Sequence, residues 1–285
     1  MRKERALIKV GSFAFLVQPD GNVMDVIEFT DFAKEIRLDV VEYHLGKGFA
    51  SKSPEYLSKL KFRARDHGLP IGYLGSGGGF AGTPEEIAER VAKAKADVDI
   101  AVFLGSPMIR LMSGRPKDDD PNPDKTWAGN IKAFQEVADY AATKAVTLGL
   151  HNHAPPARPR GSDIVRAYKE INRPNVTVIM DTGQWWPDYG TGQGTSNYQP
   201  NMKIYDYLEE VAPYATYVRA KIYKIDSGRE EYFDYPRIID ILKNVHYNGA
   251  VSVVYEGQKY NKCSDRDAIR MGADHLRRII DKAGL

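Results

Sequence analysis

The chain has 285 residues, of which 42% are hydrophobic and 27% charged, and its 40 basic and 38 acidic residues leave a formal net charge of +2. This balance is typical of a soluble globular protein and argues against a nucleic-acid-binding protein, which would carry a clustered basic surface. No apolar run approaches the roughly 18 residues of a membrane span, so no membrane partner is expected. The single cysteine, Cys263, has no partner within the chain, which favours a reducing compartment and predicts a cytoplasmic protein.

Short apolar runs alternate with longer helical patterns along the chain. In chain order, the predicted strands are "LIKVGSFAF" near Leu7, "LDVVEYH" near Asp39, "LPIGYL" near Ile71, "DIAVFLG" near Val102, "VTLGLHNH" near Leu148, "VTVIMD" near Val178, "TYVRAKIY" near Val218 and "AVSVVYEG" near Val253. Most are apolar on both faces, which indicates a parallel sheet covered by helices.

The segments between these strands carry helix-start signals. Ser53 and Thr83 each precede a proline, which places a capping side chain before the first helical residue. Glu86, three residues after Thr83, completes a capping box. Apolar residues then recur at helical spacing and predict a core-facing stripe of Ile87, Val91, Ala94 and Val98.

A strand followed by a helix, repeated about eight times, predicts an α/β fold, a (β/α)₈ TIM barrel, and we expect residues 1–285 to form one such domain. A doubly wound sheet is the alternative, but no GxGxxG motif follows the first strand, where the chain reads "VGSFAF". The glycine-rich "GSGGGF", Gly75 to Phe80, lacks the Lys-Ser/Thr of a phosphate-binding loop, so we expect it to form a flexible loop after the third strand.

The polar residues at the strand ends form the candidate site, because the active site of a barrel lies at the carboxyl ends of its strands. In chain order they are Glu42, His44, Arg110, His151, Asn152, His153, Asp181, Gln184, Trp185, Arg219, Lys221 and Glu256. His151 and His153 are two residues apart and should face the same side of their strand. A carboxylate that ends an apolar strand needs a metal, a cation or a hydroxyl to offset its desolvation. Asp181, Glu256 and the histidines are therefore candidate ligands for Mn²⁺, Mg²⁺ or Zn²⁺.

Each of these residues also has a structural interpretation. A histidine at a strand end often only satisfies a local hydrogen bond. Asp181 could cap the turn that "DTG" favours, Glu256 could be a surface charge, and Lys221 could pair with a strand-end carboxylate. Trp185 could be a core aromatic residue or a stacking platform for a sugar ring. The functional interpretation is favoured because these residues end consecutive strands.

The motif order resembles the xylose isomerase-like TIM barrels, the sugar phosphate isomerase/epimerase group: "VEYH" on the second strand, "HNH" on the fifth, "MDTGQ" on the sixth, "VRAK" on the seventh and "VVYEG" on the eighth. The resemblance implies a divalent metal, often Mn²⁺, held by Glu on strand five, Asp on six, His on seven and Glu on eight. Asp181 and Glu256 match this pattern, and His151 stands where the first Glu is usual. Arg219 stands where the strand-seven His is usual, and Gln184 replaces a further His.

By this resemblance the chain is expected to be a sugar or keto-sugar isomerase or epimerase that removes a proton beside a carbonyl. The expected catalytic residues are Glu256 as the base, His151 or His153 as the complementary acid, and Lys221 or a metal as the stabiliser of the enediolate oxygen. The expected metal ligands for Mn²⁺ or Zn²⁺ are His151, Asp181 and Glu256. The expected substrate-binding residues are Glu42, His44, Arg110, His153, Trp185 and Arg219.

Two alternatives to this function remain open. A keto-glycoside lyase would remove the same proton and then expel a leaving group one carbon further on, and a non-catalytic barrel would only bind a sugar. The expected partner in each case is a small carbohydrate, and barrels of this group commonly form homo-oligomers.

Overall fold

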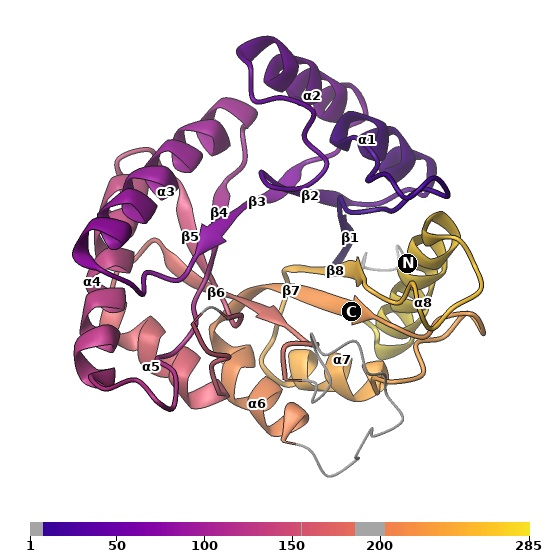
Figure 1. The fold of residues 1–285 in the computed structure, drawn as a ribbon. Coiled ribbons are helices and arrows are strands. Elements are labelled where there is room, and N and C mark those ends of the chain that lie inside the picture. The colour runs from indigo at the N-terminus through magenta and orange to yellow at the C-terminus, as the bar shows by residue number, and fades with distance from the viewer. Residues whose placement is uncertain (1–7, 155, 186–202) are drawn as a thin grey trace.

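Strands and helices alternate throughout residues 8–154, 156–185 and 203–285, which the computed structural model describes. The strands form a closed parallel barrel in chain order, with β8 paired to β1 and the helices in an outer ring (Figure 1). The strands are β1 Lys9–Phe13, β2 Val40–His44, β3 Ile71–Gly78, β4 Met108–Met112, β5 Thr147–His151, β6 Val176–Asp181, β7 Ala215–Ile222 and β8 Ala250–Tyr255. The helices are α1 Val26–Glu35, α2 Pro54–Asp66, α3 Pro84–Leu104, α4 Pro123–Ala142, α5 Gly161–Ile171, α6 Ile204–Val211, the 3₁₀ turn η1 Ala212–Tyr214, α7 Tyr235–Asn244 and α8 Asp265–Ala283. The predicted TIM barrel is confirmed.

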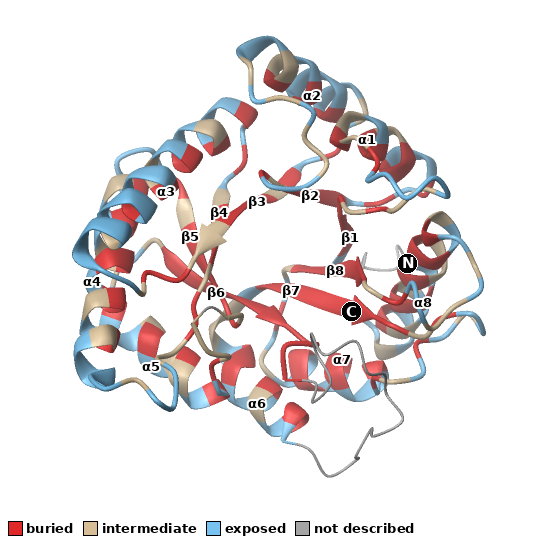
Figure 2. Cartoon of the chain, in the orientation of Figure 1, coloured by how far each residue is buried: buried red, intermediate tan, exposed pale blue. Residues whose placement is uncertain are grey.

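The strands are buried on both faces, because side chains fill the inside of the barrel and helices cover its outside. Every residue of β6 and β8 is buried, and the helices turn buried faces to the barrel and exposed faces outward (Figure 2). The predicted capping box of Thr83 and Glu86 is present at the start of α3. Within the described residues, no helix is both long and apolar enough to cross a membrane.

The prediction of a strand near Val102 is wrong, because this segment forms the C-terminal end of α3. Ala101 and Leu104 are buried at helical spacing, whereas Val102 is 44% exposed, so the apolar run has one buried face and not two. Gly105, with a φ of 78°, ends the helix. The fourth strand, β4, follows it, and Arg110 lies on that strand and not after it.

The prediction of a loop over Gly75 to Phe80 is also wrong for its first four residues, which belong to β3. Gly75 pairs with Arg110 of β4. A Cβ atom on Gly75 would lie 2.9 Å from Arg110 Nη2 and 2.9 Å from His44 Cδ2. The glycine is therefore needed because side chains of the two neighbouring strands cross over it.

Candidate functional site

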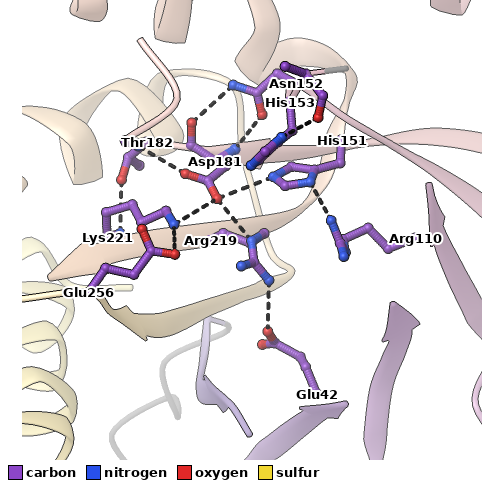
Figure 3. Close-up of polar contacts among 12 residues, drawn as sticks. Glu42, Arg110, His151, Asn152, His153, Asp181, Thr182, Arg219, Lys221 and Glu256 are labelled. Carbon is purple, nitrogen blue, oxygen red and sulfur yellow. Dashed lines mark hydrogen bonds and ion pairs between the residues drawn. The ribbon is translucent and has the colours of Figure 1, made fainter. Parts of the chain in front are cut away.

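The carboxyl ends of β5 to β8 bring together five of the predicted side chains, with Asp181 at the centre (Figure 3). Asp181 Oδ2 lies 3.2 Å from His151 Nε2, 2.9 Å from Arg219 Nε and 3.8 Å from Lys221 Nζ. Lys221 Nζ lies 2.5 Å from Glu256 Oε1. The side chain of Glu256 is 33% exposed and the other four are buried, so Glu256 is the member of the cluster that a ligand can reach.

The position of Asp181 is fixed by backbone contacts. Its N–H donates to Asn152 Oδ1 at 2.7 Å, and Asn152 Nδ2 donates to its carbonyl oxygen at 3.0 Å. The N–H of Gly183 donates to Asp181 Oδ1 at 3.0 Å. Burial opposes ionisation, but the charge of Lys221, the hydrogen bond from His151 and the charge of Arg219 together hold the pKa of Asp181 well below its ordinary value. The centre of the site is therefore a carboxylate.

His151 uses both of its ring nitrogens within the protein. Arg110 Nη1 lies 2.5 Å from His151 Nδ1, and a guanidinium can only donate, so Nδ1 accepts. Nε2 therefore carries the hydrogen and donates to Asp181. Burial, followed by the charge of Arg110, lowers the pKa of His151 well below its ordinary value. This imidazole is neutral and orients the carboxylate of Asp181.

His153 has the opposite tautomer. Its Nδ1 contacts the carbonyl oxygen of Ala154, which can only accept, so Nδ1 carries the hydrogen and Nε2 the lone pair. The ring centroid lies 5.1 Å from that of His151, in agreement with the prediction that the two histidines face the same side. Burial lowers the pKa of His153 to about 4. The arrangement provides a neutral imidazole whose Nε2 carries the lone pair, with its ring next to that of His151.

A second polar layer lies further inside the barrel, around Glu42. Tyr217, two residues before Arg219 on β7, donates to Glu42 Oε1 at 2.8 Å, and Ser252 donates to the Tyr217 hydroxyl at 3.1 Å. Arg219 Nη1 lies 3.9 Å from Glu42 Oε2 and also contacts the Tyr73 hydroxyl. Burial raises the pKa of Glu42.

Sequence reasoning missed the three hydroxyl groups of this layer, those of Tyr73, Tyr217 and Ser252. The signal was present for Tyr217, because it shares the two-residue period that points Arg219 and Lys221 into the barrel.

His44 and Arg110 lie side by side next to this cluster. The N–H of Gly46 donates to His44 Nδ1 at 3.0 Å, so Nε2 carries the hydrogen of this ring. Burial, followed by the charge of Arg110, lowers the pKa of His44 to about 2. Burial, and next Arg219, lower the pKa of Arg110 to about 10. The two residues form the wall of the site on the β2–β4 side.

Trp185 lies in the hydrophobic core and not at the site as a sugar platform. Its Nε1 donates to the carbonyl oxygen of Pro159 at 2.8 Å, and its ring centroid lies 5.5 Å from that of Tyr207 on α6. The ring is therefore covered on both sides by protein. Gln184, beside it in sequence, is fully buried, and neither amide atom has a hydrogen-bond partner among the described residues.

The donor atoms at the site do not fit a divalent metal ion. Within the described residues, no group of three or more His, Cys, Asp or Glu side chains lies close enough to hold one. The expected ligand set of His151, Asp181 and Glu256 is not assembled, because the Nε2 of His151 bears a hydrogen and both carboxylates contact cations. Arg219, at the position of the usual histidine, has no lone pair to offer a metal.

Comparisons with known proteins agree with the barrel. A sequence model described as xylose isomerase-like TIM barrel matches residues 30–279. No curated protein matches the chain. The fold is similar to that of a D-allulose 3-epimerase from Methylomonas sp., with a TM-score of 0.70, 16% identity and coverage of 98% of this chain and 100% of that chain. It is also similar to a D-psicose 3-epimerase from Clostridium cellulolyticum H10 solved with D-tagatose, with a TM-score of 0.72, 15% identity and coverage of 96% and 99%.

A third solved structure with this fold is a xylose isomerase-like TIM barrel protein from Mycobacterium smegmatis in complex with magnesium. It has a TM-score of 0.68 and 15% identity, and the alignment covers 98% of this chain and 97% of that chain. At such identities, the similarity shows a shared fold and leaves the activity to be argued from the residues.

Proposed function

Because this chain belongs to the xylose isomerase-like TIM barrel family, we propose that it is an isomerase or epimerase that acts on a sugar or keto-sugar by removing a proton beside the carbonyl. The observation that carries the proposal is the contact of 2.5 Å between Lys221 Nζ and Glu256 Oε1. Proton removal beside a carbonyl needs a base and a positive charge near the oxygen that becomes the enediolate. Glu256 and Lys221 provide both at one point.

In this proposal each group of the cluster has a defined task. Glu256, which is the accessible carboxylate, removes the proton from carbon. Lys221 faces the substrate oxygen on which negative charge develops. Of the two histidines expected as the complementary acid, His153 is the second proton-transfer group, because its hydrogen lies on Nδ1 and its lone pair on Nε2. His151 instead bonds Arg110 and Asp181 and orients the carboxylate. Asp181 and Arg219 hold these groups in place.

Ketoses are the first substrates to test, because similar folds include D-allulose and D-psicose 3-epimerases. The protein is incubated with D-allulose, D-fructose and D-tagatose in D₂O, and ¹H NMR measures the exchange of hydrogen for deuterium beside the carbonyl. We expect exchange by the wild type and a rate lower by about 10²- to 10⁴-fold in Glu256→Gln. Glu231→Gln, which removes an exposed carboxylate, is the matched control and should keep the wild-type rate.

The assay also separates the lyase and the non-catalytic alternatives. A 3-keto-glycoside incubated under the same conditions releases its aglycone only if the chain is a lyase. The proposal fails if none of the ketoses exchanges hydrogen with the solvent above the rate in buffer.

A further inference from the structure

We propose that this barrel works without a divalent metal ion, and that the Lys221 ammonium supplies the positive charge between Asp181 and Glu256. The catalytic task given to Lys221 rests on the proposed function. The exclusion of the metal is a separate property, which can be measured without any activity.

The first step of the argument is the location of the ammonium. Asp181 and Glu256 are the two carboxylates that match the metal ligands implied by the resemblance, and Lys221 Nζ lies 3.8 Å from the first and 2.5 Å from the second. A metal bound to both carboxylates would have to occupy the space that the ammonium occupies. The lysine side chain is 1% exposed and enclosed by protein, so a metal ion could not displace the ammonium into solvent without a rearrangement of the surrounding side chains.

The second step is the way in which the fold positions Lys221. Its N–H donates to Thr182 Oγ1 at 3.0 Å, and its carbonyl oxygen accepts from the Tyr235 hydroxyl at 2.6 Å. A Cβ atom on Gly183 would overlap Lys221 Cγ and lie 2.9 Å from Lys221 Cβ. The "DTG" turn after β6 thus holds the backbone of Lys221 and leaves room for its side chain, which indicates a site built around this lysine.

The third step is the fixed position of Arg219. Its Nε donates to Asp181 Oδ2 at 2.9 Å, its Nη1 contacts the Tyr73 hydroxyl, and its guanidinium carbon lies 4.8 Å from the ring centroid of Phe13. Contacts on these three sides hold the guanidinium against Asp181. The carboxylate that would be the central metal ligand is therefore shared between the side chains of Arg219 and Lys221.

The fourth step is the balance of charge in the cluster. Arg110, Arg219 and Lys221 contribute three positive charges, and Asp181 and Glu256 two negative charges. Glu42 is the one further carboxylate in contact with these groups within the described residues, and its burial favours the neutral form. A divalent ion would add two positive charges to a largely buried cluster whose described residues carry no excess of negative charge, which is strongly unfavourable in a medium of low polarity.

The chemistry remains balanced without a metal. The C–H bond beside the carbonyl breaks, its proton passes to the Glu256 carboxylate, and its electron pair forms the C=C bond of the enediolate. The electron pair of the C=O double bond moves to the oxygen, where an N–H of Lys221 stabilises the negative charge. The return of a proton to carbon reverses these changes, so no oxidant or reductant is needed.

The test measures metal binding directly. Purified protein is incubated with excess MnCl₂ and desalted, its manganese content is measured by mass spectrometry, and its Mn²⁺ affinity is measured by EPR titration. We expect far less than one ion per wild-type chain, as in Asp181→Asn. The double variant Arg219→His/Lys221→Ala exchanges the two cations for an imidazole and open space, and it should bind Mn²⁺ at least about tenfold more tightly than the wild type. Arg237→His/Lys243→Ala makes the same change on the exposed face of α7 and should behave as the wild type.

The outcomes distinguish this inference from the proposed function. One Mn²⁺ per wild-type chain that Asp181→Asn abolishes would overturn the inference, even if ketoses exchange deuterium. Equal Mn²⁺ affinity of the wild type and the folded Arg219→His/Lys221→Ala variant would also overturn it, as would a folded Lys221→Met variant that keeps the full exchange rate. A wild type that neither binds Mn²⁺ nor exchanges any ketose removes the proposed function, while the exclusion of the metal is retained.

Discussion

Arg110 donates to His151 Nδ1, and this contact determines which nitrogen of the imidazole carries the hydrogen. With Nδ1 engaged as an acceptor, Nε2–H points at Asp181 Oδ2 at 3.2 Å. A strand-end histidine that was expected to transfer protons is thereby a positioning residue, because neither nitrogen is directed at a substrate.

The first prediction concerns this tautomer. In ¹⁵N NMR spectra that resolve the ring nitrogens, His151 should show a hydrogen on Nε2 and no hydrogen on Nδ1. It should stay neutral throughout the pH range in which an ordinary imidazole takes up a proton, because burial and the charge of Arg110 hold its pKa well below its ordinary value. Arg110→Met removes the donor and should release this preference. An imidazolium signal for wild-type His151 in this range would contradict the assignment.

The second prediction concerns the buried charges around Asp181. Asp181→Asn keeps the shape of the side chain but leaves the cations of Arg219 and Lys221 without their shared carboxylate. We expect the free energy of unfolding to fall by about 3–5 kcal/mol, as is typical when one member of a buried ion pair is removed. Urea denaturation measures the change. Asp240→Asn, at an exposed position of α7, should change stability by less than about 0.5 kcal/mol, and an equal effect of the two substitutions would refute the prediction.

The convergence of the strand-end polar residues could be predicted from the sequence, because it follows from the geometry of a parallel barrel. Parallel strands in a barrel end at the same rim, so polar residues after "VTLGL", "VTVIM" and "AVSVVY" must converge whatever their contacts. The two-residue period also indicates that His151 and His153 share a side, as do Arg219 and Lys221. These arguments need only the order of the strands and the two-residue alternation of side chains along each strand, and both can be read from the sequence.

The contacts within the site were not predictable in the same way. The residue types around Asp181 are consistent both with a metal site and with an ion-pair cluster, and only the distances from Lys221 Nζ to the two carboxylates distinguish them. The helix near Val102 was mistaken for a strand because short apolar runs satisfy both patterns until the exposure of each residue is known. Whether Trp185 stacks on a sugar or packs in the core depends on its contact with Tyr207, which is distant in sequence.

The third prediction concerns the pH dependence of stability. The pKa of His153 lies at about 4 in the folded chain and near 6.5 when the group is unperturbed, so the unfolded chain binds the proton more tightly. As the pH falls from about 6.5 to about 4, the unfolded state gains protons first and the free energy of unfolding falls, by up to about 3 kcal/mol from this group. Urea denaturation of the wild type and His153→Gln across this range isolates the effect. A stability difference between the two proteins that does not change with pH would show that burial leaves this histidine unaffected.

The fourth prediction concerns Gly183, which has no motif signal beyond its place in "DTG" but lies against the side chain of Lys221. In Gly183→Ala the new Cβ would overlap Lys221 Cγ, and the lysine has to shift because Thr182 and Tyr235 hold its backbone. We expect a loss of stability of about 1–3 kcal/mol and, because a small misplacement of a reacting group is costly, a deuterium exchange rate lower by about 10²-fold.

Gly129→Ala is the matched control, because a Cβ there meets nothing within 4 Å and alanine favours the helix α4. This variant should be more stable by about 0.5–1 kcal/mol, and its exchange rate should be unchanged. If Gly183→Ala keeps the full rate while it loses stability, then the ammonium of Lys221 tolerates displacement and is not the group that stabilises the enediolate.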